Sequence, residues 1–163
     1  MATNCLFCNL RTFDYYQTLK LFENKHFFAI FDPHPVSPGH ALIIPKKHSV
    51  SLLDLNKEQW NYLKPSISAT IKIIERIDFK GLYIQMIDDK PTKKSSSFCK
   101  KMLLNPNINK KPEGYNIGNN EGKVAGRTIH HLHIQIIPRY KGDVKNPTGG
   151  IRTIIPELGD YKS

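Results

Sequence analysis

The segment that most constrains the fold is 126–140, which reads GRTIHHLHIQIIPRY. Its β-branched and apolar residues predict a strand that ends at Pro138. Side chains alternate between the two faces of a strand, so His131, His133 and Gln135 would share one face. Three polar groups are costly to bury together unless each has a partner, so this face is more typical of a functional site than of a core. The alternative is a half-exposed strand with a polar outer face.

Two other apolar segments, 26–31 and 40–45, predict an antiparallel hairpin. The loop between them contains Asp-Pro-His-Pro and Ser-Pro-Gly, which neither a helix nor a central strand accommodates. The segment 114–117 is expected to pair with 129–137, and the apolar run 81–87 is a further candidate strand. Together these segments predict an antiparallel sheet of about five strands.

One long helix is expected over 57–77. Asn56 can cap it, and Gln59 at the third helical position completes a capping box. Pro65 inside the segment predicts a kink or a later start. Apolar residues recur at spacings of three and four: Trp60, Leu63, Ile67, Ile71, Ile74 and Ile77. A sheet with one strong helical stripe places the chain in the α+β class, with the helix packed on the sheet.

The chain of 163 residues is long enough for a domain with its own core, and we expect a single domain over 1–163. A lysine-rich insertion is expected over 78–112, and its part 91–112 is expected to have little fixed structure apart from a turn of helix around 98–104. The tail, 143–163, is expected to be irregular, with one short candidate strand at 151–155.

The net charge of +10 is mostly local. Seven lysines and no acidic residue lie between Lys90 and Lys111, and without them the chain has 17 basic and 14 acidic residues. The excess favours polyanions such as nucleotides or nucleic acid, but a solvated loop is the simpler interpretation, and nucleic acid is the weaker candidate partner. No apolar run reaches the length of a membrane span, and the N-terminus lacks a signal-peptide pattern, so we expect a cytoplasmic protein.

Cys5 and Cys8 form a C-x-x-C motif, whereas Cys99 stands alone in the lysine-rich stretch. In a cytosolic protein this spacing indicates metal or redox chemistry, and not a structural disulfide. Thioredoxin-like redox use needs a βαβ context, which the chain lacks. A tetrahedral zinc site needs two more ligands, which the motif alone does not identify.

The segment 131–137 resembles the signature of the histidine triad (HIT) superfamily, in which three histidines alternate with apolar residues. It departs at the third position, where Gln135 replaces histidine. In this respect it is similar to the uridylyltransferase and dinucleoside-polyphosphate phosphorylase branch. The resemblance extends to 31–48, FDPHPVSPGHALIIPKKH, and to 114–126, GYNIGNNEGKVAG. It implies the HIT-like fold, a two-fold homodimer and a nucleotide substrate.

The resemblance also implies the catalytic residues. His133, at the middle position of the triad, would attack the α-phosphorus and hold the nucleotidyl group covalently. Gln135 would belong to the catalytic set. The implied donors to the phosphate oxygens are Asn120, Thr128 and the amide groups around Gly126.

For nucleotide binding, the resemblance implies that Asp32 accepts the ribose hydroxyls. Ile30, Phe31 and Pro33 would form the apolar wall around the base. A second interpretation is that Asp32 only caps the turn before Pro33. Arg127 replaces the glutamine of many family members, and its cationic side chain would either touch a phosphate or lie on the surface.

Zinc-binding bacterial-type members of the family take two ligands from C-x-x-C, one from the histidine that ends Pro-Lys-x-His, and one from the first triad histidine. The resemblance therefore implies a structural zinc site at Cys5, Cys8, His48 and His131. Such a closed site has no open position, so zinc would hold the N-terminus beside the catalytic strand and would not activate water. The alternative is free thiols and ordinary histidines.

These residues favour an enzyme, namely a nucleotide hydrolase or nucleotidyltransferase acting on the α-phosphate of dinucleoside polyphosphates or nucleoside phosphoramidates. Attack of water on the His133 intermediate gives hydrolysis, and attack of phosphate or a sugar phosphate gives transfer. A glutamine can hydrogen-bond but cannot change its protonation state, so Gln135 favours transfer or phosphorolysis. The alternative is a nucleotide- or nucleic-acid-binding module without turnover, whose binding would fall steeply with salt.

Overall fold

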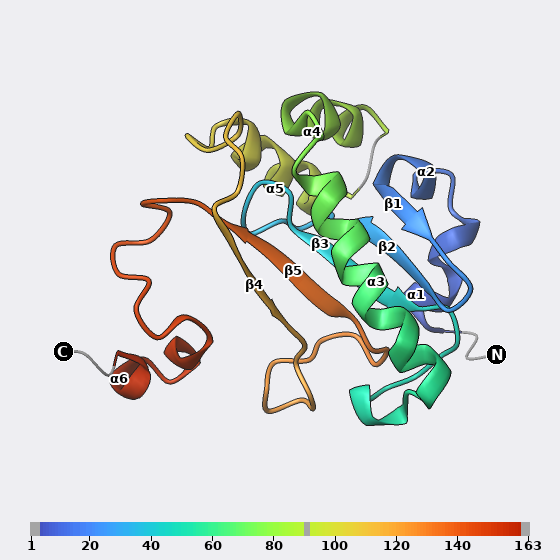
Figure 1. Ribbon diagram of the computed structural model, residues 1–163. Coiled ribbons are helices and arrows are strands. Elements are labelled where there is room, and N and C mark those ends of the chain that lie inside the picture. Colours follow the sequence, from blue (N-terminus) through green and yellow to red (C-terminus); the bar gives the residue numbers. More distant parts are fainter. Residues whose placement is uncertain (1–3, 90–91, 161–163) are drawn as a thin grey trace.

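The computed structural model describes residues 4–89 and 92–160. Its strands are β1 (Lys20–Glu23), β2 (Phe27–Phe31), β3 (Ala41–Pro45), β4 (Gly114–Gly118) and β5 (Ile134–Arg139). They form one antiparallel sheet in the order β1-β2-β3-β5-β4 (Figure 1). The prediction of an α+β protein with an antiparallel sheet of about five strands is confirmed. The sequence pattern does not identify β1, because this edge strand is short and has no fully buried residue.

The hairpin of β2 and β3 is the buried centre of the molecule. Its five residue pairs run in register from Phe27 opposite Pro45 to Phe31 opposite Ala41. Every residue of both strands is buried, which is why each strand reads as a continuous apolar run. The two predicted strands are confirmed, and each begins one residue later than expected.

The strand β5 differs from its prediction at both ends. It starts at Ile134, so His131 and His133 lie in the segment that leads into it. The expectation that these histidines are part of the strand is wrong. The strand also continues through Pro138, whereas its pairing with β3 stops at Ile136. Beyond that point β5 pairs with β4 only, and a proline is tolerated where a strand has one neighbour.

One face of the sheet is covered by α3 (Lys57–Ile74), the long helix drawn in front of the strands in Figure 1. Its predicted capping box is present: Asn56 Oδ1 accepts from the Gln59 N–H at 2.9 Å, and Gln59 Oε1 accepts from the Asn56 N–H at 3.0 Å. The helix continues through Pro65 and ends before the predicted boundary. Trp60 is 43% exposed, so the predicted apolar stripe faces the core only in part.

Two helices cover the segment for which we expected a strand and a poorly structured insertion. They are α4 (Phe79–Asp88) and α5 (Lys93–Leu103). The predicted strand at 81–87 is therefore wrong, because a short apolar run fits either kind of element. In α4 the buried side chains recur at helical spacing: Phe79, Tyr83 and Met86.

The tail folds on itself beside β4 (Figure 1). The predicted strand at 151–155 is wrong, because η3 (Gly150–Ile154) and α6 (Pro156–Gly159) occupy this region. Gly149 has φ of +85°, and a Cβ there would lie 2.1 Å from the carbonyl oxygen of Gly159, so this turn requires glycine. The last residues of the predicted tail, 161–163, lie outside the described residues.

The remaining elements are short. They are α1 (Leu6–Asn9), η1 (Leu10–Thr12), α2 (Tyr16–Leu19) and η2 (Leu52–Asp54). Among the described residues, no helix has the length and apolar character needed to cross a membrane.

Candidate active site

His133 lies directly before β5 and is 8% exposed. Its Nδ1 lies 2.9 Å from the carbonyl oxygen of His131, and because a carbonyl only accepts, Nδ1 carries the ring proton. Nε2 then keeps its lone pair, which is the form of imidazole that attacks an electrophile. The ring of Phe7 contacts the same imidazole edge-on, with the centroids 5.4 Å apart. The nucleophile predicted from the sequence is thus held in one tautomer and one orientation.

The four predicted metal ligands meet in one place. The ligand atoms of Cys5, Cys8, His48 and His131 all lie within 4.8 Å of one another. His131 Nδ1 is 3.3 Å from Cys5 Sγ and 3.6 Å from Cys8 Sγ, and Cys8 Sγ is 3.3 Å from His48 Nδ1. Zinc bonds of about 2.3 Å to sulfur and about 2.0 Å to nitrogen, at tetrahedral angles, place such atoms about 3.5 Å apart. The residues therefore fit a tetrahedral metal ion.

His131 has the protonation state of a metal ligand. Its Nε2 lies 2.9 Å from the Pro45 carbonyl oxygen, so Nε2 carries the proton and Nδ1 presents its lone pair to the two thiols. Burial lowers the pKa of His131 to about 4; the Pro45 carbonyl opposes this, while His48 and His133 add to it. A neutral imidazole whose second nitrogen donates to a carbonyl is the usual arrangement of a metal-bound histidine.

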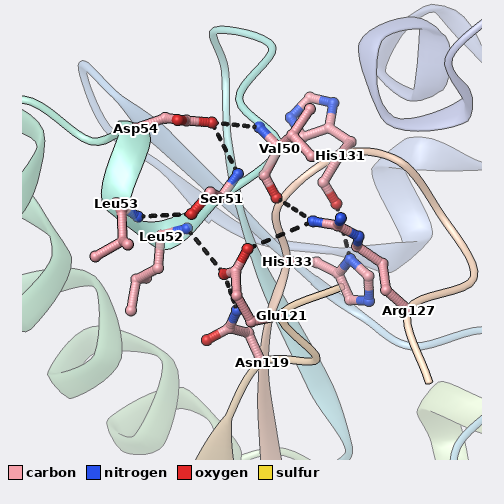
Figure 2. Close-up of polar contacts among 10 residues, drawn as sticks. All are labelled: Val50, Ser51, Leu52, Leu53, Asp54, Asn119, Glu121, Arg127, His131 and His133. Carbon is pink, nitrogen blue, oxygen red and sulfur yellow. Dashed lines mark hydrogen bonds and ion pairs between the residues drawn. The ribbon is translucent and has the colours of Figure 1, made fainter. Parts of the chain in front are cut away.

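Arg127 is attached to the segment that follows β3 (Figure 2). Its Nη1 donates to the Val50 carbonyl at 2.7 Å and lies 3.6 Å from Glu121 Oε1, and the side chain is only 14% exposed. Glu121 accepts from the Leu52 N–H at 3.2 Å and from the Asn119 side chain at 2.9 Å. The backbone hydrogen bond from Leu52 is the main cause that lowers the pKa of Glu121. We call these five residues the Arg127 clamp.

The clamp attaches the loop between β4 and β5 to the turn of η2. In that turn Asp54 accepts from the backbone N–H groups of Val50 and Ser51 at 3.1 and 2.9 Å (Figure 2). At the far end of the same loop the Leu132 N–H donates to the Ser49 carbonyl at 2.7 Å. The loop is therefore fixed at two points by contacts distant in sequence. In the structure the guanidinium of Arg127 contacts Val50 and Glu121. Nucleotide binding by Arg127 stays a prediction.

The other predicted phosphate donors lie on this loop. Gly126 has φ of +91°, and the position of a Cβ there is 3.5 Å from the side-chain nitrogen of Asn120. The backbone at position 126 therefore favours glycine, and the turn brings the Asn120 side chain against it. Thr128 is exposed, two residues further on. Gln135 is half-buried on β5, opposite Leu42 on one side and the end of β4 on the other.

Asp32 lies at the start of the loop between β2 and β3. Its Oδ1 accepts from the His34 N–H at 2.8 Å, so Asp32 does cap the turn, and its ribose contact stays a prediction. Its Oδ2 lies 3.5 Å from Nδ1 of His40, which is 3% exposed and which the sequence analysis did not single out. Burial lowers the pKa of His40, while Asp32 and Gln135 oppose this shift. His40 directly precedes β3, whose residues are all buried, and this position in the sequence could have identified it as a buried histidine.

The residues predicted to form the apolar wall around the base lie partly in the core and partly in the β2–β3 loop. Ile30 and Phe31 belong to the core, with 1% and 2% exposure. Pro33 is half-buried, and its carbonyl accepts from Ser95 Oγ of α5 at 2.8 Å. A helix from the predicted insertion thus contacts the loop that carries the expected nucleoside-binding residues.

A cleft of about 720 Å³ lies beside β4 and β5. Its walls come from the β2–β3 loop at 36–38, from 105–107 after α5, from the two strands, and from the tail between 144 and 154. Of the predicted catalytic residues, Gln135 and Asn120 line this cleft. It therefore begins at the third triad position and extends toward the tail.

Comparison with known proteins agrees with this geometry. The HIT domain matches residues 16–142. An uncharacterised 16.1 kDa HIT-like protein of Mycoplasma pneumoniae is 33% identical over 138 residues, which is 85% of this chain and 73% of the relative. An adenosine 5'-monophosphoramidase of Schizosaccharomyces pombe is 26% identical over 136 residues, which is 83% of this chain and 74% of the relative.

A crystal structure of a zinc-bound histidine triad family protein from Mycobacterium smegmatis superposes with a TM-score of 0.55 at 25% identity, covering 90% of this chain and 82% of that one. The fold and the arrangement of histidines define a protein of the histidine triad class. Since the family match spans most of the sequence, the chain belongs to the HIT family.

Proposed function

We propose that the protein is a nucleotide hydrolase or nucleotidyltransferase that forms a covalent nucleotidyl intermediate on His133. The observation that carries this proposal is the hydrogen bond from His133 Nδ1 to the His131 carbonyl, which leaves Nε2 unprotonated. The proposed substrates are dinucleoside polyphosphates or related nucleotidyl compounds such as phosphoramidates. The similarity to an adenosine 5'-monophosphoramidase supports reaction at the α-phosphorus.

The proposed reaction has two displacements. First, the Nε2 lone pair of His133 forms a bond to the α-phosphorus, and the bond to the leaving group breaks with its electron pair. The imidazole becomes positively charged, and the His131 carbonyl that accepts from Nδ1 stabilises this charge. Then water, which releases a proton to the solvent, or phosphate attacks the same phosphorus. The phosphorus–nitrogen bond breaks, its electron pair returns to Nε2, and the imidazole is neutral again.

The loop held by the Arg127 clamp would supply donors to the phosphate oxygens. We assign this role to Asn120, Thr128 and the amides around Gly126, because electrostatic stabilisation needs donors that are already in place. Gln135 would hydrogen-bond the leaving group without protonating it. A phosphate leaving group needs no proton, so Gln135 favours polyphosphate substrates over phosphoramidates. A glutamine also cannot take a proton from an attacking water, which favours phosphorolysis or transfer over hydrolysis.

For the nucleoside, we propose that Asp32 accepts the ribose hydroxyls with the oxygen that faces His40. Ile30, Phe31 and Pro33 would lie beneath or beside the base. A contact from Arg127 to a phosphate would use N–H groups of its guanidinium other than the one that donates to the Val50 carbonyl.

We propose that Cys5, Cys8, His48 and His131 bind a structural zinc ion. The spacing of the four ligand atoms and the zinc-bound relative from Mycobacterium smegmatis support this assignment. When bound, the ion would link the N-terminal segment to the start of β5. Four protein ligands fill a tetrahedral site, so its contribution would be to the fold and not to the activation of water.

We also propose that the chain is a single domain that acts as a homodimer in the cytoplasm. The outer face of α3 carries a groove of about 570 Å³ that includes Trp60, Ile67 and Ile71. Apolar and aromatic residues gathered on a helix face are typical of subunit interfaces. A strictly monomeric mass in solution would refute the dimer.

Mass spectrometry of the products from diadenosine tetraphosphate tests the function. Attack of water at the α-phosphorus yields AMP and ATP, whereas attack of inorganic phosphate yields ADP and ATP. With a substrate labelled at the α-phosphate, denatured wild type should retain label that survives base and is lost in acid, and His133→Ala should retain none. Full turnover by a folded His133→Ala variant would refute the covalent mechanism. Binding without any product would identify a nucleotide-binding module.

A further inference from the structure

The cleft beside Gln135 is surrounded by exposed apolar side chains. Four of them are between 46% and 78% exposed and line this one cavity: Val36, Val144, Ile151 and Ile154. They come from the β2–β3 loop and from the tail, so two segments far apart in sequence present apolar groups to the same space. Exposed apolar residues gathered in one place mark a binding surface.

The tail forms a defined wall of this cleft. Thr153 Oγ1 donates to the Gly150 carbonyl at 2.8 Å, and the Asn146 side chain donates to Asp160 at 2.7 Å. These contacts close the tail on itself and hold the two isoleucines of η3 at the edge of the cavity.

Among the residues that the structure describes, the polar part of the lining is rich in amides and has no net charge. The amide residues are Asn105, Asn107, Asn116, Asn119, Asn120, Gln135 and Asn146. The charged residues of the lining are Arg139 and Asp143, whose side chains pair through two hydrogen bonds of 2.7 and 2.8 Å. Amides both donate and accept, and they match the edges of nucleobases. The cleft thus combines apolar groups for a ring face with amides for a ring edge.

We propose that this cleft binds the second nucleoside of a dinucleoside polyphosphate, which is the nucleoside of the leaving group. The proposal rests on the proposed function, because it names the substrate class of the same site. Gln135 belongs both to the triad position and to the cleft lining, so the cleft begins where the leaving group departs. Its volume of about 720 Å³ suits a nucleotide-sized ligand, since such pockets are usually about 300–1,000 Å³.

Two other occupants fit less well. A bare polyphosphate chain would need cations, and the arginine of the lining is paired with Asp143 while the lysines of α5 do not line the cleft. A segment from a second copy would need no amides next to Gln135. Asp32, the residue proposed for the first ribose, is not part of this lining, so the two nucleosides would occupy separate places.

Titration calorimetry on a His133→Ala background tests the assignment, because this variant leaves the ligand intact. The probes are diadenosine tetraphosphate and adenosine 5'-tetraphosphate, which share the phosphate chain and differ in the second nucleoside. We expect the dinucleotide to bind at least about tenfold more tightly, a difference that corresponds to about 1.4 kcal/mol. Adding Ile151→Ser and Ile154→Ser should reduce this ratio to about two or less, since an apolar wall is removed. Ile84→Ser on α4, also an exposed isoleucine, is the matched control and should keep the ratio.

Each outcome decides the assignment. Equal affinity for the two probes, or a ratio that the two serines do not change, overturns it. If the serines instead change the mass in solution and leave the ratio intact, the cleft holds a second copy and the assignment fails. If the ratio collapses as expected while wild type forms neither product nor label, the cleft assignment stands and the catalytic proposal fails.

Discussion

Replacing Arg127 with alanine separates two roles that the sequence and the structure give to this residue. From the sequence, Arg127 would either touch a phosphate or lie on the surface, whereas the structure shows a guanidinium that donates to the Val50 carbonyl at 2.7 Å and lies 3.6 Å from Glu121. If Arg127 holds the loop, its loss reduces stability and misplaces the proposed phosphate donors around Asn120. If it binds a phosphate, its loss weakens substrate binding and leaves the fold unchanged.

The size of the effect follows from the two contacts. A hydrogen bond from a charged donor is worth about 1.5–3 kcal/mol when buried. The ion pair adds about 0–1 kcal/mol, because Glu121 is 46% exposed. Val50 is half-buried, so water can replace part of the lost hydrogen bond, and we expect Arg127→Ala to lower the free energy of unfolding by about 1–2 kcal/mol. A donor displaced by about 1 Å costs on the order of a hundredfold in turnover, so kcat should fall by about ten- to a hundredfold.

Urea denaturation measures the first effect, and steady-state kinetics with diadenosine tetraphosphate measures the second. Arg127→Lys keeps the charge and a donor group but loses the planar guanidinium, so it should recover part of the stability and of kcat. Arg76→Ala removes an exposed arginine at the end of α3 and serves as the control. An unchanged denaturation midpoint together with a raised KM and an unchanged kcat would refute the clamp and restore the phosphate contact.

Three further predictions concern the metal, the triad and the insertion, and a fourth concerns pH. Purified protein should contain about one zinc per chain, and Cys8→Ser should lose it and unfold at a lower temperature; metal analysis that finds none in chelator-free wild type would count against the site. Gln135→His adds a proton donor, so the ratio of AMP to ADP produced in the presence of phosphate should rise. Changing the four lysines of α5 to glutamine should keep turnover within about tenfold, or about 1.4 kcal/mol of barrier; a larger loss in folded protein would make α5 a substrate clamp. Hydrogen bonding lowers the pKa of Glu121 below its ordinary value of 4.5, so the ionised carboxylate should stabilise the fold fully above pH 4.5. The difference in free energy of unfolding between wild type and Glu121→Gln should vanish as the pH falls through the lowered pKa.

The fold could be predicted where burial is uniform or the capping is local. The strands β2 and β3 are buried throughout and read as apolar runs, and the Asn56–Gln59 box marks the start of α3. The run at 81–87 is ambiguous because seven residues fit a buried strand as well as two turns of helix. That this segment forms the helix α4 depends on tertiary contacts that bury Tyr83. One of them is with Gly39, whose N–H donates to the Tyr83 hydroxyl at 2.9 Å.

The candidate site could be predicted where residue type and spacing are sufficient. The resemblance identified Cys5, Cys8, His48 and His131 together, and the structure brings their ligand atoms to one point. The Arg127 clamp could not be predicted, because it joins segments about seventy residues apart and no local pattern encodes that contact.

His131 links the two parts of the site through different atoms. Its ring faces the thiols of Cys5 and Cys8, while its backbone carbonyl accepts the hydrogen bond from His133 Nδ1. A shift of the His131 backbone would therefore change the tautomer or the orientation of His133, the proposed nucleophile, even though the His131 ring has no part in the proposed attack. The Pro45 carbonyl and the Cys/His cluster hold the ring from opposite sides. The cluster can thus fix the direction of the His133 lone pair through the position of His131.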